Sequence, residues 1–114
     1  MRRKSGALLL TVAVFAPSSA LAEISNERAL LFAANRARTC YVEMADGRIK
    51  CGARPQRKLA EASELLTLGT LVKGDEPNIC NARTPVWLFK WRAFPTQAPI
   101  VVDATTGRVI KCRN

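Results

Sequence analysis

Four cysteines constrain this chain more than any other feature of its sequence. They stand at positions 40, 51, 80 and 112 of 114 residues. No two of them form a C-x-x-C pair and the sequence contains no histidine, so the close thiolate pairs and imidazoles typical of structural zinc sites are missing. The C-x-x-C motif of thiol redox proteins is missing as well. Whether these thiols pair as structural disulfides therefore depends on the compartment that the chain occupies.

The first 22 residues have the three regions of a secretory signal peptide. A basic start (MRRK) precedes an apolar run at 7–16 that holds no charge and a single hydroxyl, Thr11, and residues 20–22 (Ala-Leu-Ala) form a small-x-small cleavage site. A helix of this apolar run is about 15 Å long, too short to cross about 30 Å of hydrocarbon. We therefore expect residues 1–22 to be a cleaved signal peptide and residues 23–114 to form a single small domain without a transmembrane anchor. The mature protein is then secreted or periplasmic.

In an oxidising compartment, four cysteines in a short chain predict two disulfides. Three pairings are possible, and our first choice is Cys40–Cys51 with Cys80–Cys112. On the loop-entropy account these bridges contribute roughly 3 and 4 kcal/mol to stability, a large share for a domain of this size. Disulfides are thus expected to brace the fold.

The segment TCYVEMADGRIKCG, residues 39–52, allows two registers for an antiparallel hairpin. With Asp46-Gly47 as a two-residue turn, Cys40 is diagonal to Cys51, about 7–8 Å away. With a four-residue loop at 44–47, Cys40 lies directly opposite Cys51 and Val42 opposite Ile49. A relaxed disulfide needs its Cβ atoms about 3.8 Å apart, so we prefer the second register, which requires Gly47 in the left-handed region.

Two helices are expected on either side of this hairpin and its basic connector. Ser25 or Asn26 can cap a helix over about 26–38, where Arg36 and Arg38 suit the negative end of the dipole. The buried face of this helix would be formed by Leu30, Ala33, Ala34 and Ala37. A second helix is predicted to begin near Pro55 and to end at Gly69. Its apolar stripe would consist of Leu59, Ala62, Leu65, Leu66 and Leu68.

The remaining segments suit strands. A short strand is expected at 70–73, and residues 85–94 (PVWLFKWRAF) give the strongest strand pattern. Its aromatic face, Trp87, Phe89 and Trp91, suits either a core or a platform that stacks bases or sugars; we favour the core. The last segment predicts a hairpin with loop 104–107, in which Val101 faces Ile110 and Val102 faces Val109.

The phrase VDATTGRV in this last hairpin resembles the closing hairpin of PepSY-type domains over fewer than a dozen residues, and we carry no function over from it. Taken together, the elements predict an α+β fold. It would be a small antiparallel sheet, made of two hairpins plus one aromatic-rich strand, covered by two helices and stabilised by disulfides.

No recognisable catalytic constellation appears in the sequence. Histidine is absent, and the cysteines are assigned to disulfides. Of the mature serines, Ser25 falls at the start of one expected helix and Ser63 within the other, with no evident base to activate either. We therefore predict a protein that is not an enzyme and that holds no cofactor and no metal. The alternative is a small secreted effector or toxin that hydrolyses its substrate with paired carboxylates. The candidate acids are Glu43, Asp46, Glu61, Glu64, Asp75, Glu76 and Asp103.

The charge points to an anionic partner. Residues 1–22 hold three of the 18 Lys and Arg residues and none of the nine acids, so the mature net charge is +15 − 9 = +6. We predict a binding or accessory protein, such as an inhibitor, subunit or envelope factor, whose partner is an anionic protein, polysaccharide or envelope surface. Nucleic acid is not expected, because an exported protein seldom meets it. The candidate binding residues are Arg48, Lys50, Arg54, Arg57, Lys58, Lys90 and Arg92, with Lys111 and Arg113 expected beside the last two on the outer sheet face.

Overall fold

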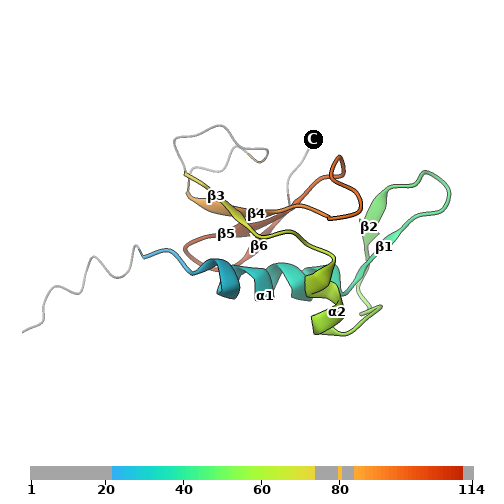
Figure 1. Cartoon of the computed structure of the whole chain (residues 1–114), viewed down its shortest axis with the longest axis horizontal. Coiled ribbons are helices and arrows are strands. Elements are labelled where there is room, and N and C mark those ends of the chain that lie inside the picture. Colours follow the sequence, from blue (N-terminus) through green and yellow to red (C-terminus); the bar gives the residue numbers. More distant parts are fainter. Residues whose placement is uncertain (1–21, 74–79, 81–83, 112–114) are drawn as a thin grey trace, which may run out of the picture.

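The computed structural model describes residues 22–73, 80 and 84–111. Within these residues the chain forms two helices and six strands, which confirms the α+β class (Figure 1). In chain order they are α1 (Asn26–Ala37), β1 (Cys40–Val42), β2 (Ile49–Cys51), α2 (Leu59–Glu64), β3 (Thr70–Val72), β4 (Val86–Phe89), β5 (Ile100–Asp103) and β6 (Val109–Ile110). The predicted signal peptide lies outside the described residues except for its last residue. No helix in the described part is both long and apolar enough to cross a bilayer.

The strands form two antiparallel sheets rather than the single sheet that the sequence predicts. β3-β4-β5-β6 is a four-stranded meander, and β1 pairs only with β2 in a separate two-stranded sheet. Helix α1 lies along one face of the four-stranded sheet and contacts β4, β5 and β6, whereas α2 packs mainly against α1 (Figure 1). Only one helix therefore covers the sheet, and the first hairpin stands at the end of α1 as a second unit.

Alanines allow α1 to approach the sheet closely. Its fully buried residues are Ala29, Ala33, Ala34 and Ala37. The predicted Leu30 is only half-buried, at the margin of this face. The helix begins as expected, because the hydroxyl of Ser25 accepts a hydrogen bond from the backbone N–H of Arg28 at 3.1 Å.

Both predicted hairpin registers are confirmed. Cys40 pairs with Cys51 and Val42 with Ile49, while Val101 pairs with Ile110. The two loops share one hydrogen-bond pattern, and each places a glycine, Gly47 or Gly107, in the left-handed region with φ of 68° and 79°. This register places Cys40 opposite Cys51, where they form the predicted disulfide. Cys80 is also disulfide-bonded, but its predicted partner, Cys112, lies outside the described residues.

The second helix is much shorter than predicted, and tertiary hydrogen bonds explain both of its ends. Before it, Arg38 Nε donates to the carbonyl of Arg57 at 3.1 Å, which holds the connector against the end of α1. After it, the N–H of Thr67 donates to Lys90 O, and the N–H of Arg92 donates to Leu65 O. The chain therefore leaves the helical path at Leu65 and runs alongside the segment that follows β4. Gly69 is consequently no helix cap; a Cβ there would lie 2.7 Å from the ring of Phe89.

This departure also changes which leucines are buried. Leu66 is 1% exposed and bridges to Trp91, whereas Leu68 is 75% exposed. Leu59 and Leu65 are exposed as well. The predicted apolar stripe thus reduces to Ala62 and Leu66.

The aromatic strand supplies core, as favoured from the sequence, although β4 ends at Phe89 rather than at residue 94. Phe89 is fully buried, Trp91 is 5% exposed, and Trp87 packs against the same core. Both indole N–H groups are satisfied inside the fold: Trp87 Nε1 donates to Ile24 O at 3.0 Å and Trp91 Nε1 to Ala98 O at 3.1 Å. These rings are therefore not an exposed stacking platform.

Candidate functional site

A basic groove lies where the two sheets approach each other. It has a volume of about 510 Å³ and is lined by residues of β2, of the chain around β6 and of the segment 97–100. Its lining includes four cations and no Asp or Glu: Arg36, Arg48, Lys50 and Lys111. We call this site the basic groove.

The four cations come from separate parts of the fold. Arg36 lies in the last turn of α1, where its charge also favours the negative end of the helix dipole. Arg48 follows the loop of the first hairpin, Lys50 lies within β2, and Lys111 follows β6 directly. Arg48, Lys50 and Lys111 are exposed, so they remain hydrated and accessible to a ligand.

One carboxylate stands beside the groove without lining it. Asp46 accepts a hydrogen bond from the backbone N–H of Arg48 at 3.0 Å and forms an ion pair with Lys50 Nζ at 3.2 Å. The Arg48 N–H, together with the side chain of Lys50, lowers the pKa of Asp46 below its ordinary value. Asp46 therefore stays ionised and balances part of the charge of Lys50, whereas no ion pair is found for Arg36, Arg48 or Lys111 among the described residues.

Only two of the predicted binding residues, Arg48 and Lys50, line the basic groove. Arg54 and Lys58 lie exposed in the connector, and Lys58 is the residue before α2. Lys90 and Arg92 are exposed just beyond the end of β4 and do not line the basic groove either.

Lys111 does not join Lys90 on the outer face of the sheet. By the register of β5 and β6, Lys111 falls next to Ile100, on the face that carries α1. Lys90 follows the buried Phe89 and so points to the opposite face. Arg113 lies outside the described residues. Arg36 is a groove residue that is missing from the predicted binding set. The one signal for it in the sequence is its place as a basic residue in the last turn of the first helix.

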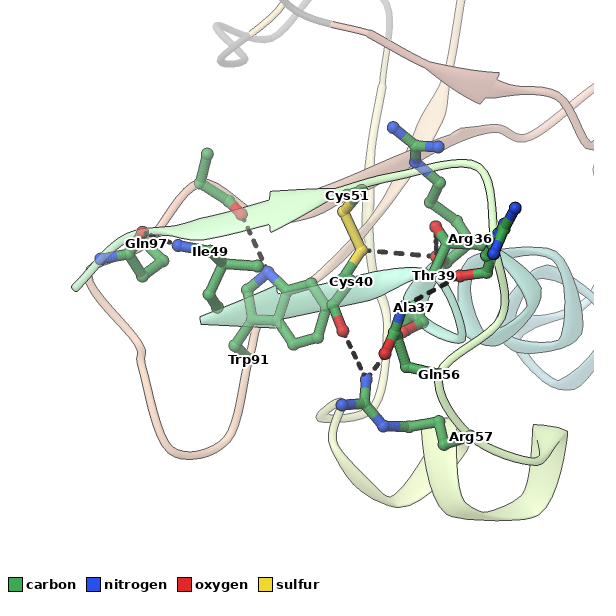
Figure 2. The surroundings of a disulfide bond; sticks show 12 residues. Arg36, Ala37, Thr39, Cys40, Ile49, Cys51, Gln56, Arg57, Trp91 and Gln97 are labelled. Atoms are coloured by element: carbon green, nitrogen blue, oxygen red, sulfur yellow. Dashed lines mark hydrogen bonds between the residues drawn. A yellow bond between two sulfur atoms is a disulfide. The ribbon is translucent and has the colours of Figure 1, made fainter. Parts of the chain in front are cut away.

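The side chain of Arg57 is half-buried and bonded within the fold, unlike the exposed side chains of Arg54 and Lys58. Its Nη1 donates to the carbonyl of Ala37 at 3.0 Å and to that of Cys40 at 2.8 Å (Figure 2). These carbonyls belong to the end of α1 and the start of β1, where helical partners run out. The guanidinium therefore connects the helix, the hairpin and the connector at one point.

A second, apolar hollow of about 340 Å³ lies on the other side of the first hairpin. Its apolar lining includes Tyr41, Val42, Leu65 and Phe94, and its polar lining is Arg57, Glu64 and Arg92. Ile49 and Trp91 line both hollows and thus stand between them.

The carboxylates do not gather in either hollow. Glu64 is the only acid in the apolar one, and the basic groove has none. Asp103 accepts hydrogen bonds from the N–H groups of Thr105 and Thr106 in its own hairpin loop, and Glu61 accepts one from the N–H of Lys58. Asp75 and Glu76 lie outside the described residues. No group of three metal-binding side chains occurs among the residues described, and carboxylate hydrolysis stays a prediction.

Comparison with known proteins assigns no function to this arrangement. The chain matches no family model, and no curated protein or solved structure is significantly similar to it. The site is therefore interpreted from its own charges and geometry.

Proposed function

We propose that the protein is an exported binding or accessory domain that holds an anionic partner in the basic groove. The observation that carries this proposal is the convergence of Arg36, Arg48, Lys50 and Lys111 on one groove whose lining contains no acid. Export is supported by the signal-like leader and by the Cys40–Cys51 disulfide, which is typical of oxidising compartments. In such a setting the partner is an acidic protein, an acidic polysaccharide or an anionic envelope surface.

The exposure of these cations defines how such binding should behave. A single exposed charge contributes little binding free energy. Salt also screens it, because the Debye length is only about 8 Å at physiological ionic strength. Several cations on one groove act together on a polyanion, and their attraction weakens as salt is added. We therefore expect affinity to depend on the groove cations as a set and to fall steeply with ionic strength.

Heparin, a dense polyanion, provides the test. We expect the wild-type protein to bind it at low ionic strength and to release it as sodium chloride is raised. The triple variant Arg48→Gln, Lys50→Gln, Lys111→Gln should bind about tenfold or more weakly, since charges facing an anionic surface contribute roughly 1 kcal/mol each. Titration calorimetry or fluorescence measures the change.

The control removes the same net charge elsewhere. Arg28, Arg54 and Lys58 are exposed and do not line the basic groove, so Arg28→Gln, Arg54→Gln, Lys58→Gln should retain most of the affinity. If both triple variants lose affinity equally, heparin affinity depends only on the net charge of the protein, and the basic groove is not the binding site.

A further inference from the structure

The apolar hollow beside the first hairpin has the size and the lining of a small-molecule site. Its volume of about 340 Å³ falls within the range of about 300–1,000 Å³ that such sites occupy. Apart from Arg57, Glu64 and Arg92, its lining residues are aliphatic, aromatic or the disulfide-bonded Cys40. An apolar wall with a few charged groups at one place is the usual composition of a site for a small organic molecule.

Three aromatic side chains border this hollow. Trp91 is buried, and its indole N–H already donates to Ala98 O, so the ring presents an apolar surface. Tyr41 and Phe94 are 41% and 37% exposed although aromatic side chains carry much of the apolar area that a small domain can bury. Their exposure around one hollow leaves apolar surface that a planar ring can cover in an offset or edge-on arrangement.

Backbone hydrogen bonds hold the borders of the hollow in place. The N–H of Arg92 donates to Leu65 O at 2.9 Å, which keeps the end of α2 against the segment that follows β4. The N–H of Phe94 donates to Trp91 O at 3.2 Å, and Phe94 O accepts from the N–H of Gln97 at 3.0 Å. Because these borders are already ordered, a ligand would enter a preformed hollow and would lose little free energy to ordering it.

The charged groups of the hollow favour an anion. Arg57 and Arg92 outnumber Glu64 in its lining. Arg57 already donates to the carbonyls of Ala37 and Cys40. Arg92 is exposed, and its guanidinium makes no hydrogen bond or ion pair within the described part of the chain. A planar guanidinium matches a carboxylate, which it can bind through two parallel hydrogen bonds.

We propose that the apolar hollow is a second binding site and that it takes a small aromatic acid. The ring of the acid lies against Trp91 and Phe94, and Arg92 binds its carboxylate. The two hollows share only Ile49 and Trp91 in their lining. This site therefore goes beyond the proposed function and does not depend on it.

Naphthylacetate and naphthylacetamide are matched probes, because they share one ring system and differ in the charge of the side group. Their binding to the exported, disulfide-bonded protein is followed by NMR. Leu65 and Phe94 line only the apolar hollow, whereas Arg36 and Lys111 line only the basic groove. The signals of these residues therefore report which of the two hollows is occupied.

We expect naphthylacetate to shift the signals of Leu65 and Phe94 and to leave those of Arg36 and Lys111 in place. Naphthylacetamide should occupy the same hollow about fivefold more weakly, because it forms no ion pair with Arg92.

The variant Arg92→Gln should bind naphthylacetate about fivefold more weakly than the wild type and naphthylacetamide equally well. This substitution keeps the backbone hydrogen bond to Leu65 O, so the border of the hollow is retained. Lys90→Gln is the control, since it removes the same charge from an exposed residue that lines neither hollow. It should bind both probes as the wild type does.

Each alternative has its own result. If neither probe shifts Leu65 and Phe94, or if naphthylacetate shifts Arg36 and Lys111 instead, the second site is overturned. Equal affinity for the two probes, or an equal loss in Arg92→Gln and Lys90→Gln, overturns the recognition of a carboxylate by Arg92. None of these results bears on the heparin test, because the residues changed in that test line no part of the apolar hollow.

Discussion

Single basic residues of this protein differ sharply in what surrounds them. Arg54 and Arg57 are three positions apart in one basic connector, yet Arg54 is exposed while Arg57 inserts its guanidinium between two backbone carbonyls. A charged side chain that donates hydrogen bonds to the unpaired carbonyls at the end of a helix has a structural role, even when the basic residues beside it in the sequence are exposed. The sequence therefore shows where the basic residues stand in the chain, but it does not show which of their side chains are free to bind a partner.

This difference predicts a stability effect. Arg57→Gln removes the donor to Ala37 O and Cys40 O, and we expect the free energy of unfolding to fall by about 1.5–3 kcal/mol. Arg54→Gln changes the net charge equally but loses no side-chain hydrogen bond among the described residues, so its effect should stay within about 0.5 kcal/mol. Urea denaturation with the disulfides intact measures both. Similar losses in the two variants would contradict the structural role of Arg57.

At the scale of elements, the first hairpin is the part that most needs support. β1 and β2 have three residues each and form their own two-stranded sheet, and a hairpin of this kind is marginal in water by itself. Three connections hold it: the Cys40–Cys51 disulfide, the Arg57 contact to Cys40 O, and the Gln97 contact to Ile49. Because β2 forms one border of the basic groove, the order of this hairpin is also a condition of the site.

Removing the disulfide should therefore act locally first. In Cys40→Ala, Cys51→Ala we expect a loss of about 3 kcal/mol, the loop-entropy value for a short bridged segment. The amides of Tyr41 and Lys50 should lose exchange protection before those of the β4–β5 pair. Hydrogen exchange followed by NMR resolves the two sheets separately. An equal loss of exchange protection in both sheets would show that the hairpin does not unfold separately from the four-stranded sheet.

For the molecule as a whole, the signal-like first 22 residues and the cysteines both support the proposed export into an oxidising compartment. The predicted mature domain, 23–114, keeps all four cysteines and a net charge of +6. Small exported domains with limited cores commonly depend on disulfides. The described core is correspondingly modest, with alanines providing much of it.

Intact mass of the exported protein tests this account. We expect a chain that begins at Glu23, with the mass of two disulfides and no thiol that alkylates before reduction. After reduction, four thiols should alkylate. A retained leader or alkylation without reduction would contradict the proposed export or the predicted pairing.

Local interactions explain what the sequence by itself determined. The cap of α1 and both hairpin registers follow from contacts within a few residues, including the glycines Gly47 and Gly107 in their loops. The Cys40–Cys51 bridge follows from the first of these registers. Such features are readable because the residues that specify them are neighbours in the chain.

Only the tertiary structure decided the rest. The end of α2 depends on hydrogen bonds between residues 65–67 and 90–92, and helical periodicity in 55–69 carries no information about them. The basic groove likewise depends on where the separate first hairpin stands relative to β6, which brings Arg36, Arg48 and Lys111 together. These positions arise from packing between segments that are distant in sequence. The pattern within one segment does not predict which other segment it will pack against.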